Sequence, residues 1–121
     1  MNDGAQTQRL DRAAIDRLLD LGGEKLLAGM IDLFLEHYPV RIQAARLGAA
    51  VGEHDAVRRA AHSLKSTAGN LGATSLQLLA ARIEELATSE DSAYDALIGP
   101  FEEEFHAVRG LLEREREGLG T

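Results

Sequence analysis

The sequence predicts an all-α fold: an antiparallel four-helix bundle with a short additional helix at the N-terminus. Apolar residues recur at three- and four-residue spacing through most of the chain, which is the period of helices with one buried face. No segment alternates apolar and polar residues as a half-buried strand does. Only two of the 121 residues are prolines and 4% are aromatic. That composition is typical of a helical bundle rich in alanine and leucine.

The N-terminal half predicts a short helix followed by a long one. Asp11 can cap the short helix, and Gly22-Gly23 ends it. A long helical pattern then runs from about Glu24 to Ala50. Pro39 lies inside this pattern and lacks a backbone donor, so we expect it to kink or divide the helix. The residues expected to face the core are Ile15, Leu18, Leu19, Leu27, Met30, Ile31, Phe34, Tyr38, Ile42 and Ala45.

The next helix follows a turn at residues 48–52 and carries His62. It begins near Glu53 or His54 and ends around Asn70 to Gly72, and Gly72 suits a left-handed cap. At about 100° per residue, its apolar side chains share one face and His62 falls on the opposite face. We therefore expect the His62 imidazole to point into solvent. The apolar face consists of Val57, Ala60, Leu64 and Leu71, with Ala68 at its margin.

Two helices complete the bundle. The first is expected to begin with a capping box made by Thr74 and Gln77. The second begins at Asp91 or Ser92, and Gly99-Pro100 can interrupt it. Their predicted core residues are Leu76, Leu79, Ile83 and Leu86 in the first, and Leu97, Ile98, Phe101, Phe105, Val108 and Leu112 in the second.

Length and composition indicate one domain and exclude several classes of function. We expect the bundle to span residues 11–117, between flexible ends at 1–10 and 118–121. The chain has no cysteine, which excludes disulfides and thiolate metal sites. No apolar run is long enough for a membrane span or a signal peptide, so we expect a cytoplasmic protein. A net charge of -7 argues against nucleic acid as a partner. Because the bundle buries its own apolar faces, we expect a monomer.

Basic and small residues surround His62 on its exposed face. Cationic side chains lie one turn before and one turn after it, and little bulk stands beside it. This arrangement suits an imidazole that carries a phosphoryl group and must be reached by another protein. The basic residues are Arg58, Arg59 and Lys65, and the small ones are Ser66 and Gly69.

The chemistry of imidazole predicts a further partner for His62. Histidine has an ordinary pKa of about 6.5, so at physiological pH one ring nitrogen can attack phosphorus. The other nitrogen then carries a proton and needs an acceptor. Glu84 lies on the following helix, at the edge of its apolar stripe. We predict that Nδ1–H of His62 donates to Glu84 and that Nε2 attacks. Lys65, with Arg58 and Arg59, would attract the phosphoryl oxygens.

The run HSLKSTAGNLGA, residues 62–73, resembles the signature of histidine-containing phosphotransfer (Hpt) domains. His62, Lys65, Gly72 and Ala73 match that pattern, and Ser66 stands where the family commonly has glycine. The resemblance implies a helical bundle that relays phosphoryl groups between receiver domains in multistep two-component signalling. It also implies that a Glu or Gln about 22 residues after the histidine accepts the hydrogen bond of its ring, and Glu84 has that offset.

The resemblance implies that His62 accepts a phosphoryl group from a receiver phospho-aspartate and relays it to another receiver. The expected partners are receiver domains of response regulators and a hybrid sensor histidine kinase. The chain has no Gly-rich nucleotide loop and no carboxylate cluster beside His62, so we expect no cofactor and no metal site of its own. It would be a phosphocarrier rather than a kinase or phosphatase, with Mg²⁺ supplied by the receiver. The alternative is a non-phosphorylated Hpt-like adaptor that only binds a signalling partner.

Overall fold

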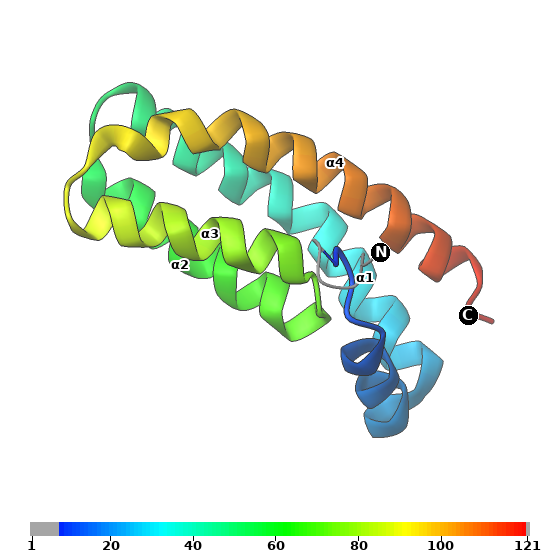
Figure 1. Cartoon of the computed structure of the whole chain (residues 1–121). Coiled ribbons are helices and arrows are strands. Elements are labelled where there is room, and N and C mark those ends of the chain that lie inside the picture. The colour runs from blue at the N-terminus through cyan, green and yellow to red at the C-terminus, as the bar shows by residue number, and fades with distance from the viewer. Residues whose placement is uncertain (1–7, 121) are drawn as a thin grey trace, which may run out of the picture.

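Short connections link four helices, so that each helix runs antiparallel to the next (Figure 1). The computed structural model describes residues 8–120, and no strand lies in that range. Helix α1 contacts α2 and α4, and α3 also contacts both, which closes a four-helix bundle. The predicted all-α fold class is confirmed. The elements are α1 (Arg12–Ala50), α2 (His54–Leu71), α3 (Thr74–Thr88), the 3-10 turn η2 (Ser92–Tyr94) and α4 (Asp95–Glu117).

Helix α1 consists of two helical segments that meet at Gly23. The backbone leaves the helical region there, with φ 75° and ψ -170°, a conformation that glycine tolerates and other residues rarely adopt. Residues 12–22 therefore project from the end of the bundle as a separate short helix (Figure 1). Asp11 caps this helix, because its side chain accepts a hydrogen bond from the backbone N–H of Ala13 at 3.0 Å. The predicted additional N-terminal helix is thus present.

Neither proline interrupts its helix. Helix α1 continues through Pro39, and Gly23 is its one non-helical residue. Helix α4 likewise continues through Pro100. The helix is therefore not divided at Pro39, and the other expected effect there, a kink, stays a prediction. The expectation that Gly99-Pro100 interrupts α4 is wrong. Both prolines lie on exposed faces, so the carbonyl group that each leaves without an intrahelical donor can bind water instead.

A stack of aromatic side chains fills the centre of the core and reaches the helix that carries His62. The ring centroids of Phe34 and Tyr38 lie 4.2 Å apart, and those of Tyr38 and Phe105 lie 5.5 Å apart. Fully burying such a side chain contributes about 1.5–3 kcal/mol. The Tyr38 hydroxyl donates to the backbone carbonyl of Leu64 on α2 at 2.9 Å. Burial raises the pKa of this hydroxyl far above its usual range, so it remains a donor and fixes α2 against α1.

The corner between α2 and α3 depends on Gly72. This residue has φ 79° and forms the left-handed cap that the sequence predicts. A Cβ atom on Gly72 would lie 2.7 Å from the Cβ of Ala14, and the Gly72 carbonyl accepts from the N–H of Asp11 at 2.8 Å. The predicted capping box is wrong. Helix α3 already includes Thr74, and Ala73 precedes it without a side-chain cap, because the tight glycine turn starts the helix one residue earlier.

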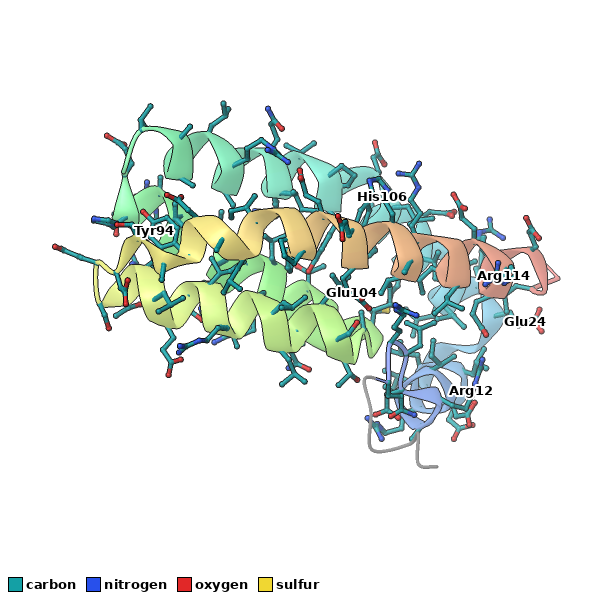
Figure 2. The ribbon with its side chains drawn as sticks, turned by 45° about the horizontal axis from the view of Figure 1, so that its top comes forward. Arg12, Glu24, Tyr94, Glu104, His106 and Arg114 are labelled. Atoms are coloured by element: carbon teal, nitrogen blue, oxygen red, sulfur yellow. The ribbon has the colours of Figure 1, made fainter. Side chains whose placement is uncertain are left out.

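Both ends of the described chain pack onto the bundle. The guanidinium of Arg9 donates to Glu104 at 2.7 Å, and Arg12 pairs with Glu115. Figure 2 shows Arg12, Glu24 and Arg114 near the short helix and the C-terminal end of α4, and Glu104 further back along α4. The N–H of Gly120 donates to Glu24 at 2.8 Å. Residues 1–7 and 121 of the predicted flexible ends lie outside the described residues. None of the described helices is long and apolar enough to cross a membrane.

Candidate functional site

His62 lies near the middle of α2 on its solvent side. The opposite face of α2 is packed into the core, with Val57, Leu64 and Leu71 at most 1% exposed. The side chain of His62, in contrast, is 60% exposed. The periodicity of the helix therefore produces the predicted result, because burial of one face turns the imidazole outward.

Glu84 of α3 holds the inner nitrogen of the His62 ring. Nδ1 of His62 lies 2.8 Å from Oε2 of Glu84, and the glutamate side chain is only 19% exposed. A carboxylate can only accept, so Nδ1 carries a proton, and in the neutral form of the ring Nε2 then keeps its lone pair. The contact predicted between these residues is present in the structure. It fixes both the tautomer of the ring and its orientation.

Lys65 contacts the same carboxylate. Its Nζ atom lies 2.6 Å from Oε1 of Glu84, so each carboxylate oxygen has its own donor from α2. Burial acts to raise the pKa of Glu84, but hydrogen bonds from Lys65 and His62, together with the positive charge of Lys65, outweigh it. The net effect lowers the pKa of Glu84, which keeps the group ionised. In the structure Lys65 therefore forms an ion pair with Glu84. Sequence reasoning missed this contact.

Arg58 and Arg59 both bind Asp55, one turn earlier on α2. Two guanidinium nitrogens of Arg58 lie 3.1 and 2.7 Å from Oδ1 of Asp55, and Nη1 of Arg59 lies 3.1 Å from its Oδ2. The hydrogen bond from Arg58 lowers the pKa of Asp55. The arginines lie on the expected face, but their charges are shared with this carboxylate. Spacings of three and four residues could have revealed the pairing.

The small residues after His62 have different surroundings. Ser66 is exposed one turn after His62. Gly69 faces α3 instead, where an added Cβ would lie 2.8 Å from Nε2 of Gln77. Gly69 therefore lies against the end of the flexible Gln77 side chain, whereas Ser66 lies on the exposed surface of α2. The sequence pattern alone did not separate these two uses of a small residue.

Comparison with known protein families identifies the family of the chain. The model of the Hpt domain matches residues 29–118, which include His62, Lys65 and Glu84. The chain belongs to the Hpt-domain family. Membership makes it a histidine phosphotransfer protein of the two-component phosphorelay type. The resemblance noted in residues 62–73 is thereby confirmed.

A solved structure agrees with this assignment. The Hpt domain is similar to the crystal structure of histidine-containing phosphotransfer protein B (HptB) from Pseudomonas aeruginosa PAO1, with 27% sequence identity and a TM-score of 0.86. The match covers 93% of this chain and 97% of that chain. Comparison with curated proteins gave no significant match. The likeness to HptB therefore extends over nearly the whole of both chains.

His54 and His106 of the Hpt domain do not form a comparable site. His54 begins α2, and its Nδ1 lies 2.7 Å from the hydroxyl of Tyr94 at the far end of the bundle. His106 is exposed on α4 (Figure 2) and follows Glu103 at the Glu-x-x-His spacing of some metal sites. Between residues 8 and 120, however, no three His, Cys, Asp or Glu side chains form a group that could hold a metal ion.

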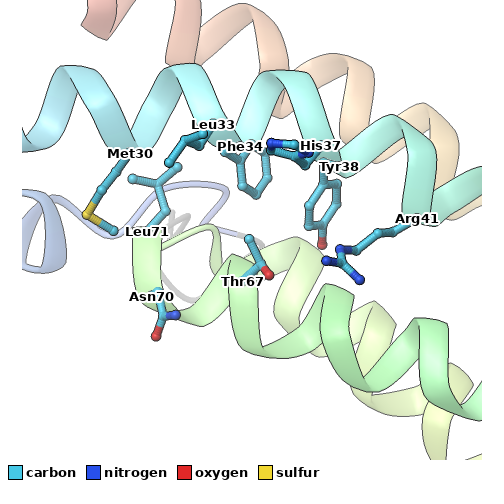
Figure 3. Close-up of a pocket in the computed structure, with 9 residues that line it drawn as sticks. All are labelled: Met30, Leu33, Phe34, His37, Tyr38, Arg41, Thr67, Asn70 and Leu71. Atoms are coloured by element: carbon cyan, nitrogen blue, oxygen red, sulfur yellow. The ribbon is translucent and has the colours of Figure 1, made fainter.

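A groove lies between α1 and α2. It has a volume of about 270 Å³ and brings apolar side chains to the surface (Figure 3). A second hollow, lined by Arg41, Ala44 and Arg59 among others, continues along the same pair of helices. His62 lies on α2 between these two hollows. The groove is lined by Met30, Leu33, Phe34, His37, Tyr38 and Arg41 of α1 and by Thr67, Asn70 and Leu71 of α2.

Proposed function

We propose that His62 accepts a phosphoryl group from the phospho-aspartate of one receiver domain and passes it to the aspartate of another. One observation carries this proposal: the imidazole is exposed, and its Nδ1 is held by Glu84. An attacking nucleophile must keep its lone pair free and stand where the phosphorus can reach it. Nε2 of His62 satisfies both conditions.

The geometry of His62 and Glu84 accounts for each bond formed or broken in the transfer step and for the position of the proton. Nε2 attacks phosphorus, the N–P bond forms, and the P–O bond to the aspartyl carboxylate breaks. The aspartate leaves as a carboxylate, and the proton on Nδ1 stays between His62 and Glu84. The ring then carries a positive charge, which the Glu84 carboxylate stabilises. Return of the phosphoryl group to a second receiver follows the same path in reverse.

The chain supplies a nucleophile and its support, and we propose that it has no kinase or phosphatase activity of its own. Phosphoryl transfer requires charge neutralisation on the oxygens around phosphorus. We propose that Mg²⁺ is provided by the receiver, which holds it beside its phospho-aspartate. Arg58 and Arg59 can contribute from this side, to the extent that Asp55 leaves their charges available.

The proposed docking surface for the receiver is the groove between α1 and α2 with the exposed apolar residues beside it. Leu33, Val40 and Leu47 recur at seven-residue spacing on α1, and each is more than half exposed. Apolar patches of this kind, rimmed by polar residues, mark protein interfaces. Arg41 lies in the groove and makes no ion pair within residues 8–120, so it is available to the carboxylates of a receiver.

Label transfer from a phosphorylated receiver tests this function. The purified protein is incubated with a ³²P-labelled receiver and Mg²⁺, and the label is followed on both chains. We expect wild type to become labelled in an acid-labile, base-stable form and His62→Gln to remain unlabelled. His106→Gln is the matched control, because it removes an exposed imidazole on α4 and should label normally. Equal labelling of wild type and His62→Gln would overturn the assignment, and absence of any label would favour an adaptor.

A further inference from the structure

We propose that the Ser66 hydroxyl donates a hydrogen bond to the phosphoryl group carried on Nε2 of His62 and so lengthens the lifetime of the phosphohistidine. This role deepens the proposed function and rests on it for one premise, that His62 carries a phosphoryl group. The group that Ser66 binds is a phosphoryl oxygen, and Ser66 takes no part in the hydrogen bond between His62 and Glu84.

Attachment at Nε2 directs the phosphoryl group away from α3. Nδ1 of His62 faces α3, where Oε2 of Glu84 lies 2.8 Å away. The bonds that leave the two nitrogens of an imidazole point toward nearly opposite edges of the ring. A phosphoryl group on Nε2 therefore lies over the flank of α2 that is turned away from α3.

Ser66 lies on this flank of α2, one turn after His62. Side chains four positions apart on a helix are neighbours, with about 5–6 Å between their Cβ atoms. At about 100° per residue, Ser66 falls between His62 and Asn70, and Asn70 lines the groove between α1 and α2. Lys65 falls on the other flank, where it reaches Glu84 of α3. The Ser66 hydroxyl is thus on the same side of His62 as a phosphoryl group on Nε2.

Ser66 also has a hydroxyl that is free to bind a new acceptor. Four polar side chains lie three or four positions from His62 on α2, and three of them are already paired with carboxylates: Arg58, Arg59 and Lys65. Ser66 is exposed, and its side chain forms no hydrogen bond within residues 8–120. Its hydroxyl can therefore turn to a phosphoryl oxygen without breaking a contact within that range.

The hydrogen bond should slow the loss of the phosphoryl group. A hydroxyl that donates to a charged oxygen forms a short, charge-assisted hydrogen bond. When the N–P bond breaks through a loose, metaphosphate-like transition state, the phosphoryl oxygens carry less negative charge than they do in phosphohistidine. The Ser66 hydroxyl then stabilises the phosphohistidine more than the transition state, so hydrolysis to inorganic phosphate becomes slower.

The lifetime of the phosphohistidine can be measured without a receiver. Phosphoramidate phosphorylates histidine directly: the N–P bond to Nε2 forms, the P–N bond of the reagent breaks, and ammonia leaves. The reagent is then removed and the decay is followed by ³¹P spectroscopy, with the His62 signal identified by its absence from His62→Gln. We expect Ser66→Ala to shorten the lifetime about two- to fivefold, as the loss of one exposed hydrogen bond would. Ser66→Thr keeps the hydroxyl and should retain the wild-type lifetime.

Ser63 provides a matched control on the same helix. Ser63→Ala makes the same exchange beside His62, but adjacent positions on a helix do not face each other, so the lifetime should stay unchanged. A lifetime in Ser66→Ala that equals or exceeds that of wild type would overturn the proposal. Equal shortening in Ser63→Ala, or a lifetime in Ser66→Thr as short as in Ser66→Ala, would overturn it as well.

Label transfer from a phosphorylated receiver tests the proposed function separately. If neither wild type nor Ser66→Ala takes up label from a receiver, the proposed function fails, while the lifetimes after chemical labelling still decide the role of Ser66. If both take up label, Ser66→Ala should hold a smaller share at equilibrium, because the hydrogen bond stabilises phospho-His62 relative to the phosphorylated receiver. Equal shares in the two proteins would count against the hydrogen bond.

Discussion

Oε2 of Glu84 lies 2.8 Å from Nδ1 of His62, although the two residues are 22 positions apart in the sequence and lie on different helices. The antiparallel packing of α2 against α3 produces this approach. It places an ionised carboxylate behind the imidazole and leaves the opposite edge of the ring to solvent. The reactivity that we propose for His62 depends on this pair.

Removal of the Glu84 side chain should impair transfer without unfolding the bundle. We expect Glu84→Ala to lower the transfer rate about tenfold and to shorten the lifetime of phosphohistidine, because a charge-assisted hydrogen bond to the ring contributes about 1.5–3 kcal/mol when well made and less when partly exposed. Rapid-quench labelling measures both quantities. Glu85→Ala is the control, since this neighbour is exposed and pairs with Arg82. Wild-type rate and lifetime in Glu84→Ala would remove the proposed role.

The stability of the fold should depend on pH through Glu84. Lys65 and His62 lower the pKa of Glu84 in the folded protein despite burial. The ionised Glu84 side chain therefore stabilises the folded state at pH values above the ordinary carboxyl pKa of about 4.5. That contribution is lost as the pH falls below this value and through the lowered folded-state pKa. Urea unfolding should therefore show wild type losing stability relative to Glu84→Gln as the solution is acidified. A difference between the two proteins that is constant across this range would contradict the assignment.

The glycine at the end of α2 should be the most sensitive glycine of the bundle. Gly72→Ala combines a left-handed φ of 79° with a contact of 2.7 Å to Cβ of Ala14, and we expect it to lower the free energy of unfolding by about 2–3 kcal/mol. Gly52→Ala has a similar φ of 71° with no atom within 4 Å, so it isolates the backbone term of about 1 kcal/mol. Equal losses in the two variants, measured by urea unfolding, would show that the contact with Ala14 contributes nothing.

A charge on the exposed stripe of α1 should weaken receiver docking. We expect Leu33→Asp and Val40→Asp to reduce receiver affinity at least tenfold, since each places a carboxylate against an acidic partner and removes apolar contact area. Both side chains are exposed, so the fold should be preserved. Leu78→Asp is the matched control, because Leu78 is 66% exposed on α3, away from the groove. If calorimetric titration shows that all three variants bind the receiver with the affinity of wild type, the receiver docks elsewhere.

The sequence was sufficient to predict the arrangement of the helices and the exposure of His62. Periodicity placed Val57, Leu64 and Leu71 in the core, and this alone turns His62 outward. Gly72 was recognised as a helix end because few other residues accept a left-handed backbone. The offset between His62 and Glu84, read with the family resemblance, was sufficient to pair them.

Contacts between exposed polar side chains were harder to predict. The effect of Pro39 depends on whether the freed carbonyl faces water, which a sequence does not show. The partner of Lys65 depends on the rotation of α3 relative to α2. Gly69 was assigned to clearance around the histidine, although the atom closest to an added Cβ belongs to Gln77. Each of these outcomes is determined by the packing between helices rather than by local sequence.

The position of the phosphoryl group on the protein tests the central claim most directly. The protein is labelled with ¹⁵N in its histidine rings, phosphorylated by a phospho-receiver with Mg²⁺, and examined by ¹H–¹⁵N and ³¹P spectroscopy. The account predicts a single phosphohistidine, on Nε2 of His62, with the proton retained on Nδ1 beside Glu84. A phosphoryl group on Nδ1 of His62, or on any other residue, would contradict it.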